Sequence, residues 1–467
     1  MSVAVSTTER RSPFRKGDEV TVTVDRMAYG GRGVGRVDGY VVFVPDTAPG
    51  DRVRARLWRV KAGYAEADLV AVESPSVQRT APPCPHFGPC GGCAWQHLDY
   101  AGQVSAKESI VRESLAHLAG LHDVEVMPII RMADPWYYRN KMEFTFHPDG
   151  SLGLHRRGAF DKIVPIETCL LQSPETNEIL RIVRDWARER GLSRYDARAH
   201  TGLLRQVVVR EGKRTGEIMV GLITTAPEVP GTDALAARLA AAVPRIASVL
   251  HGVNPGVSDG LPLARVSVVA GRPYIKEELA GVQFQIGLET FFQTNTVQAG
   301  RLVEVVEALA DLGGGEAVLD LYCGIGTFSL PLARRARQVC GIEISAQAVD
   351  AARENAVLNQ VANVEFVAGD VRRLLPEVVG RTGRPDLLVL DPPRSGAGRR
   401  VMQKIVDAGA PRIVYVSCNP TTLAPDLGDL VREGYVVRAV QPLDQFPHTY
   451  HVECVVLLER SGAPQPD

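Results

Sequence analysis

Apolar and polar positions alternate along the first part of the chain. From Gly17 to Ser74, short apolar segments such as VTVTV and YVVFV are separated by turns that carry glycine, aspartate and proline. An alternation with a period of two is typical of half-buried β-strands. About five such strands in one short stretch predict a small β-barrel of the oligonucleotide-binding type.

The pattern changes after residue 98. Ile110, Val111, Leu115 and Leu118 lie at helical spacing and predict a helix over about 98–121. Further on, three stretches resemble antiparallel strands and one resembles an amphipathic helix. In order they are MEFTFHPDGSLGLHRRG, RQVVVREGKRTGEIMVGLIT, DALAARLAAAV (the helix) and VSVVAGRPYIKEEL. We therefore expect a mixed, β-rich central region.

After Phe291 strands alternate with helices to the end of the chain. The predicted strands include AVLDLY, QVCGIEI, VEFVAGD, DLLVLD and RIVYVS, with helices between them. This order predicts an α/β region with a mostly parallel, doubly wound sheet. We place the three regions at 14–75, 76–281 and 282–467. The helix at 98–121 is a candidate to pack on the third region.

The length and composition agree with a multidomain globular protein. The chain has 467 residues, of which 45% are hydrophobic, and this length favours two or three domains. No apolar run is long enough to cross a bilayer, so we expect no membrane segment. The N-terminus MSVAVSTTERRSPFRKG lacks the charge order of a secretory signal. We interpret it as the basic tail of a cytoplasmic protein.

The net charge of −1 does not by itself indicate a nucleic-acid partner. Basic residues are nevertheless concentrated locally, and such clusters are suited to contact phosphates. They are Arg52, Arg54, Arg56, Arg59 and Lys61 in one segment, and Arg139 and Lys141 in another. A solvated strand edge is the alternative interpretation.

A glycine loop, DLYCGIGT, follows strand AVLDLY and precedes a helix. Glycines there let the backbone approach a ligand, and a helix N-terminus favours an anionic group. Glu343, about 20 residues further on at the end of the next strand, is placed to bind ribose hydroxyls. Phe328 and Ser329 stand near the position of the third glycine of the dinucleotide fingerprint, which favours S-adenosylmethionine. A structural turn is the alternative.

Two aspartates end the following strands. Asp370 ends the third strand and Asp391 the fourth, and the carboxyl ends of strands in such a sheet line the ligand crevice. Asp370 is equally suited to cap a helix. Pro392, Pro393 and Arg394 follow Asp391, and the two prolines stiffen the chain beside the crevice.

Cys418 and Glu453 are candidates for covalent chemistry at the same crevice. Cys418 stands in SCNP at the end of the fifth parallel strand, where a nucleophile would face the cofactor. An inert, buried cysteine is the alternative. Glu453 begins the last, apolar strand, where carboxylates are rare unless they are paired at a sheet edge. A cysteine, a base and a methyl donor around one pocket are what methylation of uracil carbon 5 requires.

Three of the eight cysteines lie within ten residues, namely Cys84, Cys90 and Cys93. Without a secretory signal, this clustering favours a metal site in a reducing compartment over disulfides.

Taken together, the motifs FFQTN, DLYCGIGTFSL, DPPR, VSCNP and FPHTYHVE, in this order, resemble the TRAM-domain RNA uridine-5 methyltransferases, over about residues 14–460. The resemblance implies that the N-terminal barrel is an RNA-binding TRAM domain and that the central region helps to grip RNA. It implies that Cys418 is the nucleophile, Glu453 the proton-abstracting base, and Phe291 a neighbour of the target base. The implied S-adenosylmethionine contacts are Gln293, Tyr322, Glu343, Asp370 and Asp391. Thr327 stands where some relatives carry asparagine and is left out.

Four cysteines, Cys84, Cys90, Cys93 and the distant Cys169, resemble the cluster ligands of the ribosomal-RNA subgroup of this family. The resemblance implies a 4Fe-4S cluster with a structural role, and zinc is the alternative because four cysteines also satisfy it. Cys323, Cys340 and Cys454 are expected to be packing residues.

The expected product is 5-methyluridine in RNA. The four cysteines and the TRAM region favour 23S ribosomal RNA, and transfer RNA remains open. An RNA cytosine-5 methyltransferase uses the same cysteine chemistry, whereas an exocyclic-amine methyltransferase needs no such cysteine. A non-catalytic RNA chaperone is the alternative from another class. Nothing in the sequence indicates an obligate protein partner.

Overall fold

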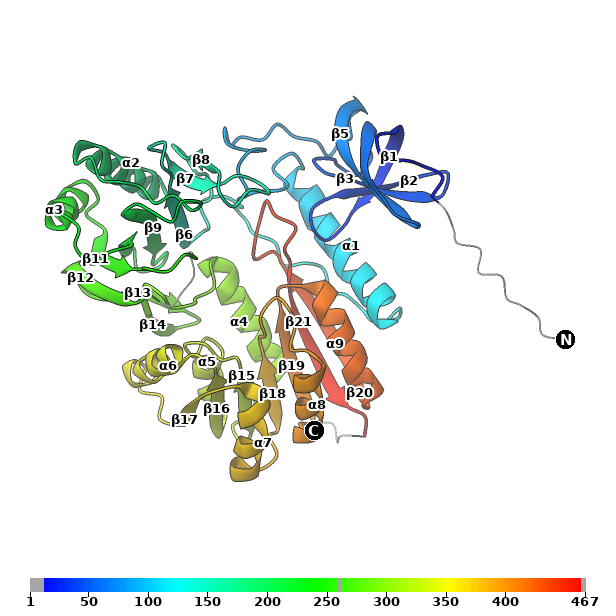
Figure 1. The fold of residues 1–467 in the computed structure, drawn as a ribbon. Helices are drawn as coiled ribbons and strands as arrows, with labels where there is room; N and C mark the ends of the chain where they lie inside the picture. The colour runs from blue at the N-terminus through cyan, green and yellow to red at the C-terminus, as the bar shows by residue number, and fades with distance from the viewer. Residues whose placement is uncertain (1–11, 259–262, 463–467) are drawn as a thin grey trace.

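The computed structural model describes residues 12–258 and 263–462 (Figure 1). The first eleven residues, which hold most of the basic N-terminal tail, lie outside the described part of the chain. Among the described residues no helix is long and apolar enough to cross a membrane.

The N-terminal region is a closed five-stranded barrel, as the alternating pattern predicted. Its strands are β1 (Glu19–Met27), β2 (Gly33–Val37), β3 (Tyr40–Val44), β4 (Arg52–Val60) and β5 (Tyr64–Ser74), in the order β1-β2-β3-β5-β4. Val20, Val22 and Val24 point inward and are buried, while the residues between them are exposed. Burial of every second side chain therefore forms the barrel core, which agrees with a TRAM domain.

The arginines of the basic segment at 52–61 form ion pairs with glutamates of the barrel itself. Arg54 and Arg56 both contact Glu19 on the adjacent strand, at 3.2 and 2.7 Å. Arg59 likewise contacts Glu66, at 2.9 Å. Because these arginines are engaged within the barrel, their charge alone does not define a phosphate-binding face.

Helix α1 (Tyr100–Ala119) connects the barrel to the C-terminal region (Figure 1). Asp99 caps its start by accepting a hydrogen bond from the Gly102 amide, and Gly120 ends it in a left-handed conformation. The helix packs mainly on α9 (Pro420–Arg432) and also contacts β1. The helix that the apolar spacing predicted therefore does pack on the C-terminal region.

A seven-stranded sheet forms the central region, in the order β12-β11-β10-β9-β6-β7-β8. Its strands are β6 (Lys141–Phe146), β7 (Leu152–His155), β8 (Ile163–Pro165), β9 (Leu204–Glu211), β10 (Ile218–Thr224), β11 (Ile246–Val253) and β12 (Arg265–Gly271). Helices α2 (Pro174–Glu189) and α3 (Thr232–Ala242) pack on one face through a shared apolar core. All pairs are antiparallel except β10 with β11, because α3 carries the chain across before β11 begins.

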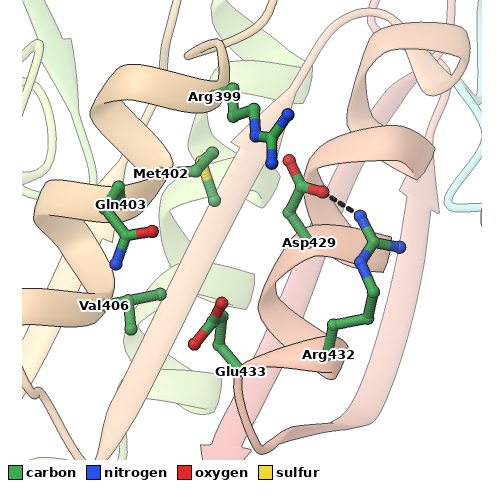
Figure 2. A pocket seen from close by; sticks show the side chains of 7 residues that line it. All are labelled: Arg399, Met402, Gln403, Val406, Asp429, Arg432 and Glu433. Carbon is green, nitrogen blue, oxygen red and sulfur yellow. Dashed lines mark hydrogen bonds and ion pairs between the residues drawn. The ribbon is translucent and has the colours of Figure 1, made fainter.

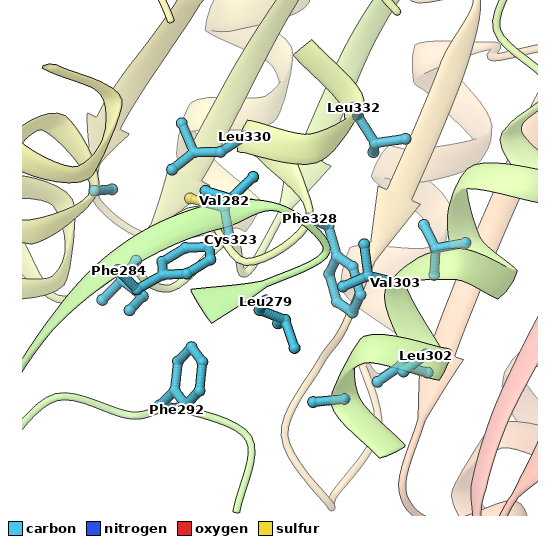
Figure 3. Close-up of a cluster of buried hydrophobic side chains, with 14 of the residues drawn as sticks. Leu279, Val282, Phe284, Phe292, Leu302, Val303, Cys323, Phe328, Leu330 and Leu332 are labelled. Atoms are coloured by element: carbon cyan, nitrogen blue, oxygen red, sulfur yellow. The ribbon is translucent and has the colours of Figure 1, made fainter. Parts of the chain in front are cut away.

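One of the predicted antiparallel pieces is divided between two sheets. β12 completes the central sheet, whereas β13 (Tyr274–Leu279) pairs only with β14 (Val282–Gly287) in a separate hairpin. Figure 3 shows this hairpin packed through Leu279 and Phe284 against helix α4 (Thr296–Ala310) and residues such as Phe328 and Leu330. Cys323 is buried in this same core, as expected for a packing residue.

The C-terminal region is the doubly wound sheet that the strand–helix alternation predicted, in the order β17-β16-β15-β18-β19-β21-β20. Its strands are β15 (Ala317–Leu321), β16 (Gln338–Glu343), β17 (Val364–Ala368), β18 (Leu387–Leu390), β19 (Arg412–Ser417), β20 (Tyr435–Leu443) and β21 (Glu453–Arg460). The first five are parallel, and β21 inserts antiparallel beside β19. The helices between the strands are α5 (Ser329–Ala333), α6 (Ala346–Leu358), α7 (Val371–Thr382), α8 (Arg399–Ala408) and α9.

The chain reverses direction across this sheet between β15 and β18. It runs outward from β15 to β17 and then returns to β18 on the other side of β15. Such a switch point opens a crevice at the carboxyl ends of the two central strands, which is where ligands bind in open α/β sheets.

Candidate active site

The glycine loop lies at the switch point and is tied to Glu343. Tyr322 and Gly324 have positive φ values of 65° and 55°, so the chain turns sharply out of β15. The Gly324 amide donates a hydrogen bond to Glu343 Oε2 at 3.2 Å, and the Ser345 amide donates to Oε1 at 2.9 Å. Glu343 therefore sits beside the loop, at the end of β16, in the position that a ribose-binding carboxylate needs.

Asp320, at the start of the glycine loop, has a buried carboxyl group. It was not among the site residues predicted from the sequence. Its Oδ2 accepts a hydrogen bond from the Ser329 hydroxyl at 2.5 Å, while Oδ1 has no partner among the described residues. Burial raises the pKa of Asp320 to about 7, and Glu343 adds to the rise. Asp320 is therefore a buried carboxyl whose hydrogen-bonding capacity the described residues do not fully satisfy.

Asp391 and Gln293 meet on the β18 side of the crevice. Gln293 Nε2 donates to Asp391 Oδ2 at 3.4 Å, and Gln293 Oε1 accepts from Gln445 at 3.2 Å. Burial, followed by the charge of Asp320, raises the pKa of Asp391 to about 7. These side chains come from three separate segments, so the fold itself assembles this group.

Asp370 serves as the N-cap of helix α7, the alternative that the sequence left open. Its side chain accepts a hydrogen bond from the Arg372 amide at 2.8 Å and pairs with the Arg372 guanidinium at 2.5 Å. The hydrogen bond from Arg372 lowers the pKa of Asp370 to about 2. Burial raises the pKa of Tyr322 to about 12, and the charge of the nearby Asp370 adds to this rise. Asp370 thus lies at the crevice rim on the β17 side.

Cys418 and Glu453 lie side by side where β19 ends and β21 begins. Ser417 pairs with Cys454 in the register of the two strands, which makes Cys418 and Glu453 the next facing positions. Glu453 is only 2% exposed, and burial together with Asp391 raises its pKa well above the ordinary carboxylate value. Burial, then Glu453 and Asp391, raises the pKa of Cys418 to about 12. The structure therefore places a thiol, a proton-holding carboxylate and the cofactor crevice together.

Arg394 places a positive charge beside Cys418 and Glu453. From the sequence, Arg394 was noted only as part of the DPPR motif. Its positive charge lowers the pKa of the nearby Cys418 thiol, against the effect of burial. It also opposes the rise in the pKa of Glu453. Arg394 is thus the residue that favours the thiolate form of Cys418.

A buried polar network anchors the segments that carry these groups. Lys107 of α1 donates to Asp444 Oδ1 at 2.5 Å, and both side chains are fully buried. Asn295 Nδ2 donates to the Gln445 carbonyl at 3.1 Å, and Gln298 Nε2 donates to the Asp444 carbonyl at 3.0 Å. These bonds join α1, the FFQTN segment and the chain leading into β21, so they fix Gln293 and Glu453 relative to each other.

The four cysteines of the predicted cluster line one cavity in the central region. Cys84, Cys90, Cys93 and Cys169 all border it, together with apolar neighbours such as Met142, Leu154 and Ile166. Within residues 12–258 and 263–462, however, no three His, Cys, Asp or Glu side chains are arranged to hold a metal ion. The structure thus brings the distant Cys169 to the other three cysteines without forming a single-ion site.

A second hollow, shown in Figure 2, lies between helices α8 and α9. Its lining includes Met402 and Val406 of α8 and the ion pair between Asp429 and Arg432. It contains none of the residues at the crevice, so it is not part of the candidate active site.

A crevice at the switch point of a parallel sheet, with a glycine loop, a carboxylate at the end of the next strand and a neighbouring cysteine–glutamate pair, is typical of an enzyme that binds a nucleoside cofactor. Two family models agree with this class. "tRNA (Uracil-5-)-methyltransferase" matches residues 265–461, and "TRAM domain" matches residues 13–70.

Relatives match almost the whole chain. An RNA methyltransferase of Halalkalibacterium halodurans is 39% identical over 97% of this chain and 99% of its own length. Another, from Caldanaerobacter subterraneus subsp. tengcongensis, is 40% identical over 96% of this chain and all of its own length. The crystal structure of Pyrococcus abyssi tRNA (uracil-54, C5)-methyltransferase with S-adenosyl-L-homocysteine has a TM-score of 0.75 and 30% identity, covering 94% of this chain and 99% of that one.

The chain therefore belongs to the TRAM-containing family of S-adenosylmethionine-dependent RNA (uracil-5-)-methyltransferases. This confirms the enzyme class and the methyl donor that the motifs predicted.

Proposed function

We propose that this enzyme forms 5-methyluridine in RNA by covalent catalysis, with Cys418 as nucleophile and Glu453 as base. The observation that carries this proposal is the placement of Cys418 and Glu453 at facing positions of β19 and β21, at the edge of the cofactor crevice. Cys418 is partly exposed at the crevice, whereas Glu453 is buried behind it. A nucleophile must reach the substrate, and Glu453 must be ionised at the moment when it takes the carbon 5 proton.

The crevice residues fit S-adenosylmethionine. Glu343 would bind the ribose, Asp370 and Tyr322 would border the adenosine, and Gln293 and Asp391 would lie near the reacting centre. When bound, S-adenosylmethionine supplies an electrophilic methyl group and a positive charge. The buried carboxylates, with one oxygen of Asp320 lacking a partner, suit a cationic ligand.

The proposed chemistry assigns each residue one task. Cys418 first loses its thiol proton to solvent, and Glu453 starts as the carboxylate. The Cys418 thiolate, stabilised by Arg394, then forms a bond to uracil carbon 6 and pushes the electrons of the C5–C6 double bond into an enolate. Carbon 5 of the uracil would then take the methyl group as its bond to the donor's sulfur breaks, and S-adenosylhomocysteine would leave. Glu453 removes the proton from carbon 5, the C5–C6 double bond re-forms, and the bond to the Cys418 sulfur breaks. The enzyme is restored once Glu453 has released its proton.

The test is methylation of RNA by purified enzyme with a labelled methyl donor, followed by nucleoside analysis. We expect 5-methyluridine from the wild type and none from Cys418→Ala. The product 5-methylcytidine would show a cytosine-5 methyltransferase instead. An active Cys418→Ala enzyme would show that the methylation needs no nucleophilic cysteine.

We further propose 23S ribosomal RNA as the substrate, because the four-cysteine cavity resembles the ribosomal-RNA subgroup of the family. Transfer RNA is the second candidate, and the tRNA (uracil-54, C5)-methyltransferase of Pyrococcus abyssi supports it. Nucleosides from each RNA of a strain that lacks this protein distinguish the two. Loss of 5-methyluridine from ribosomal RNA is the expected result, and loss from transfer RNA alone would overturn the assignment.

Four cysteines line the cavity, and four thiolates can hold either a 4Fe-4S cluster or a zinc ion. A cluster is bound by four thiolates spread around a larger volume, which agrees with an apolar cavity lined by four cysteines. We propose that Cys84, Cys90, Cys93 and Cys169 hold it in a structural role. Iron and sulfide analysis of protein purified without oxygen tests this, and stoichiometric zinc would contradict it.

A further inference from the structure

The loop between β1 and β2 leaves the barrel and packs on the FPHTYHVE segment. The Tyr29 hydroxyl lies 3.4 Å from His451 Nδ1, and the Tyr29 ring meets Tyr450 edge-on with centroids 5.3 Å apart. Trp95 Nε1 donates a hydrogen bond to the Gly31 carbonyl at 3.2 Å. A Cβ at Gly31 would lie 2.9 Å from the Tyr450 ring. The loop is therefore closely fitted to this segment.

His451 lies close to the candidate catalytic residues. It precedes β21 by two residues, and β21 begins with Glu453 beside the end of β19. Its ring packs between Tyr450 and Phe446, with centroid distances of 4.3 and 5.9 Å. The Tyr29 hydroxyl adds a polar contact to these aromatic contacts, and a polar contact to one ring nitrogen favours one orientation of the ring.

The charge state of His451 sets the direction of the hydrogen bond. Burial, followed by the positive charge of Arg394, lowers the pKa of His451 to about 3, so the imidazole is neutral. We infer that the Tyr29 hydroxyl donates to Nδ1, which leaves the ring proton on Nε2. The hydrogen bond thus selects one tautomer as well as one ring orientation.

Tyr29 also shares the electrostatic environment of the reacting residues. Burial raises the pKa of the Tyr29 phenol to about 12, and Cys418 is the next cause, with a further contribution from Glu453. A residue near the start of the chain therefore lies close to a site formed by residues about 400 positions later. The sequence gives no sign of this, because the contact is made by folding alone.

We propose that Tyr29 is a positioning residue of the active site: its hydroxyl fixes the His451 imidazole as one wall of the pocket beside Cys418. The docked TRAM barrel is then part of the catalytic site as well as an RNA-binding module. This inference rests on the proposed covalent function. Its physical basis is that nucleophilic addition requires the target base to be held within a narrow range of distance and angle.

The test compares full-length Tyr29→Phe with the wild type and with Tyr64→Phe, which removes a hydroxyl from a barrel tyrosine whose ring meets Phe43 edge-on instead. RNA that carries 5-fluorouridine traps the enzyme, because the fluorine blocks the final proton removal. The rate of trapping at saturating RNA and methyl donor reports the steps up to methyl transfer. The dissociation constant for RNA is measured separately.

We expect Tyr29→Phe to form the trapped adduct roughly two- to tenfold more slowly, as loss of one neutral hydrogen bond implies. Its RNA dissociation constant stays within about twofold of the wild-type value, and Tyr64→Phe behaves as wild type. Unchanged binding of S-adenosylhomocysteine shows that the variant is folded. An unchanged trapping rate, or an effect on RNA affinity alone, would overturn the proposal.

A double variant shows whether Tyr29 acts through His451. In the His451→Ala background, we expect Tyr29→Phe to cause no further slowing, because the hydroxyl has lost its acceptor. Losses that multiply independently would contradict the proposed route. If the wild type itself traps no RNA, that result contradicts the proposed covalent function and is distinct from a failure of the proposal for Tyr29.

Discussion

Replacing Lys107 with methionine tests the buried network that anchors the catalytic segments. Lys107 Nζ lies 2.5 Å from Asp444 Oδ1 and 2.9 Å from the Phe446 carbonyl, and neither side chain of the ion pair is exposed. Methionine keeps most of the apolar stem but removes the cation. From the described residues, the Asp444 carboxylate then retains only the hydrogen bond from the Tyr100 hydroxyl, at 2.7 Å.

Removal of one partner from a buried ion pair costs about 3–5 kcal/mol, because a charge is left without compensation. Each kcal/mol lost from the free energy of unfolding lowers the melting temperature of a domain of about 150–250 residues by about 2–4 °C. We therefore expect Lys107→Met to unfold about 6–20 °C below the wild type. The double variant Lys107→Met/Asp444→Asn leaves no buried charge and keeps an acceptor for Tyr100, so we expect it to recover most of this loss.

Thermal unfolding followed by circular dichroism measures the effect. Lys404→Met is the matched control, because Lys404 pairs with Asp407 at 3.6 Å on the surface and is 42% exposed. An exposed pair contributes at most about 1 kcal/mol, so this variant should melt close to the wild type. Two results would contradict this account of the buried pair. One is a melting temperature of Lys107→Met equal to that of the control, and the other is a double variant as unstable as the single one.

Three further predictions concern the catalytic crevice. Glu453→Gln should accumulate a covalent adduct with ordinary substrate RNA, visible by denaturing electrophoresis, because nothing removes the carbon 5 proton; free RNA only would contradict this. The raised pKa of Asp391, about 7, means that its carboxyl is neutral below this pH and charged above it. Affinity for S-adenosylmethionine should therefore rise between about pH 6 and pH 8 by calorimetry, and that for uncharged S-adenosylhomocysteine should rise less; parallel curves would refute the charge argument. Gly326→Ala should weaken cofactor binding about tenfold, because φ at Gly326 is +87° and an added Cβ would lie 3.1 Å from the Phe366 ring. The control Gly314→Ala, at φ +104° with no atom within 4 Å of the added Cβ, should leave cofactor binding unchanged.

The regular elements could be predicted from the sequence because their patterns are local. Alternating valines in β1 and the strand–helix order after Phe291 depend on burial within each element, so they predicted the barrel and the doubly wound sheet. The parallel pairing of β10 with β11 was not predicted, since it depends on where helix α3 returns the chain.

The candidate site could be predicted only in part. Cys418 and Glu453 were identified because their chemistry and their places at strand ends are visible in the sequence. The pair of Lys107 with Asp444 joins residues 337 positions apart, and the contact of Tyr29 with His451 spans 422. No local pattern marks such contacts. The unpartnered oxygen of Asp320 is also a property of the folded crevice alone.

The central claim is that Cys418 forms a bond to the target uracil. Its most direct test is mass spectrometry of the protein after reaction with 5-fluorouridine RNA and S-adenosylmethionine, followed by digestion with protease and nuclease. We predict one modified peptide, which contains Cys418 and carries a methylated fluorouridine nucleotide on its sulfur. A trapped nucleotide on any other residue, or complete turnover with no trapped peptide, would contradict the account.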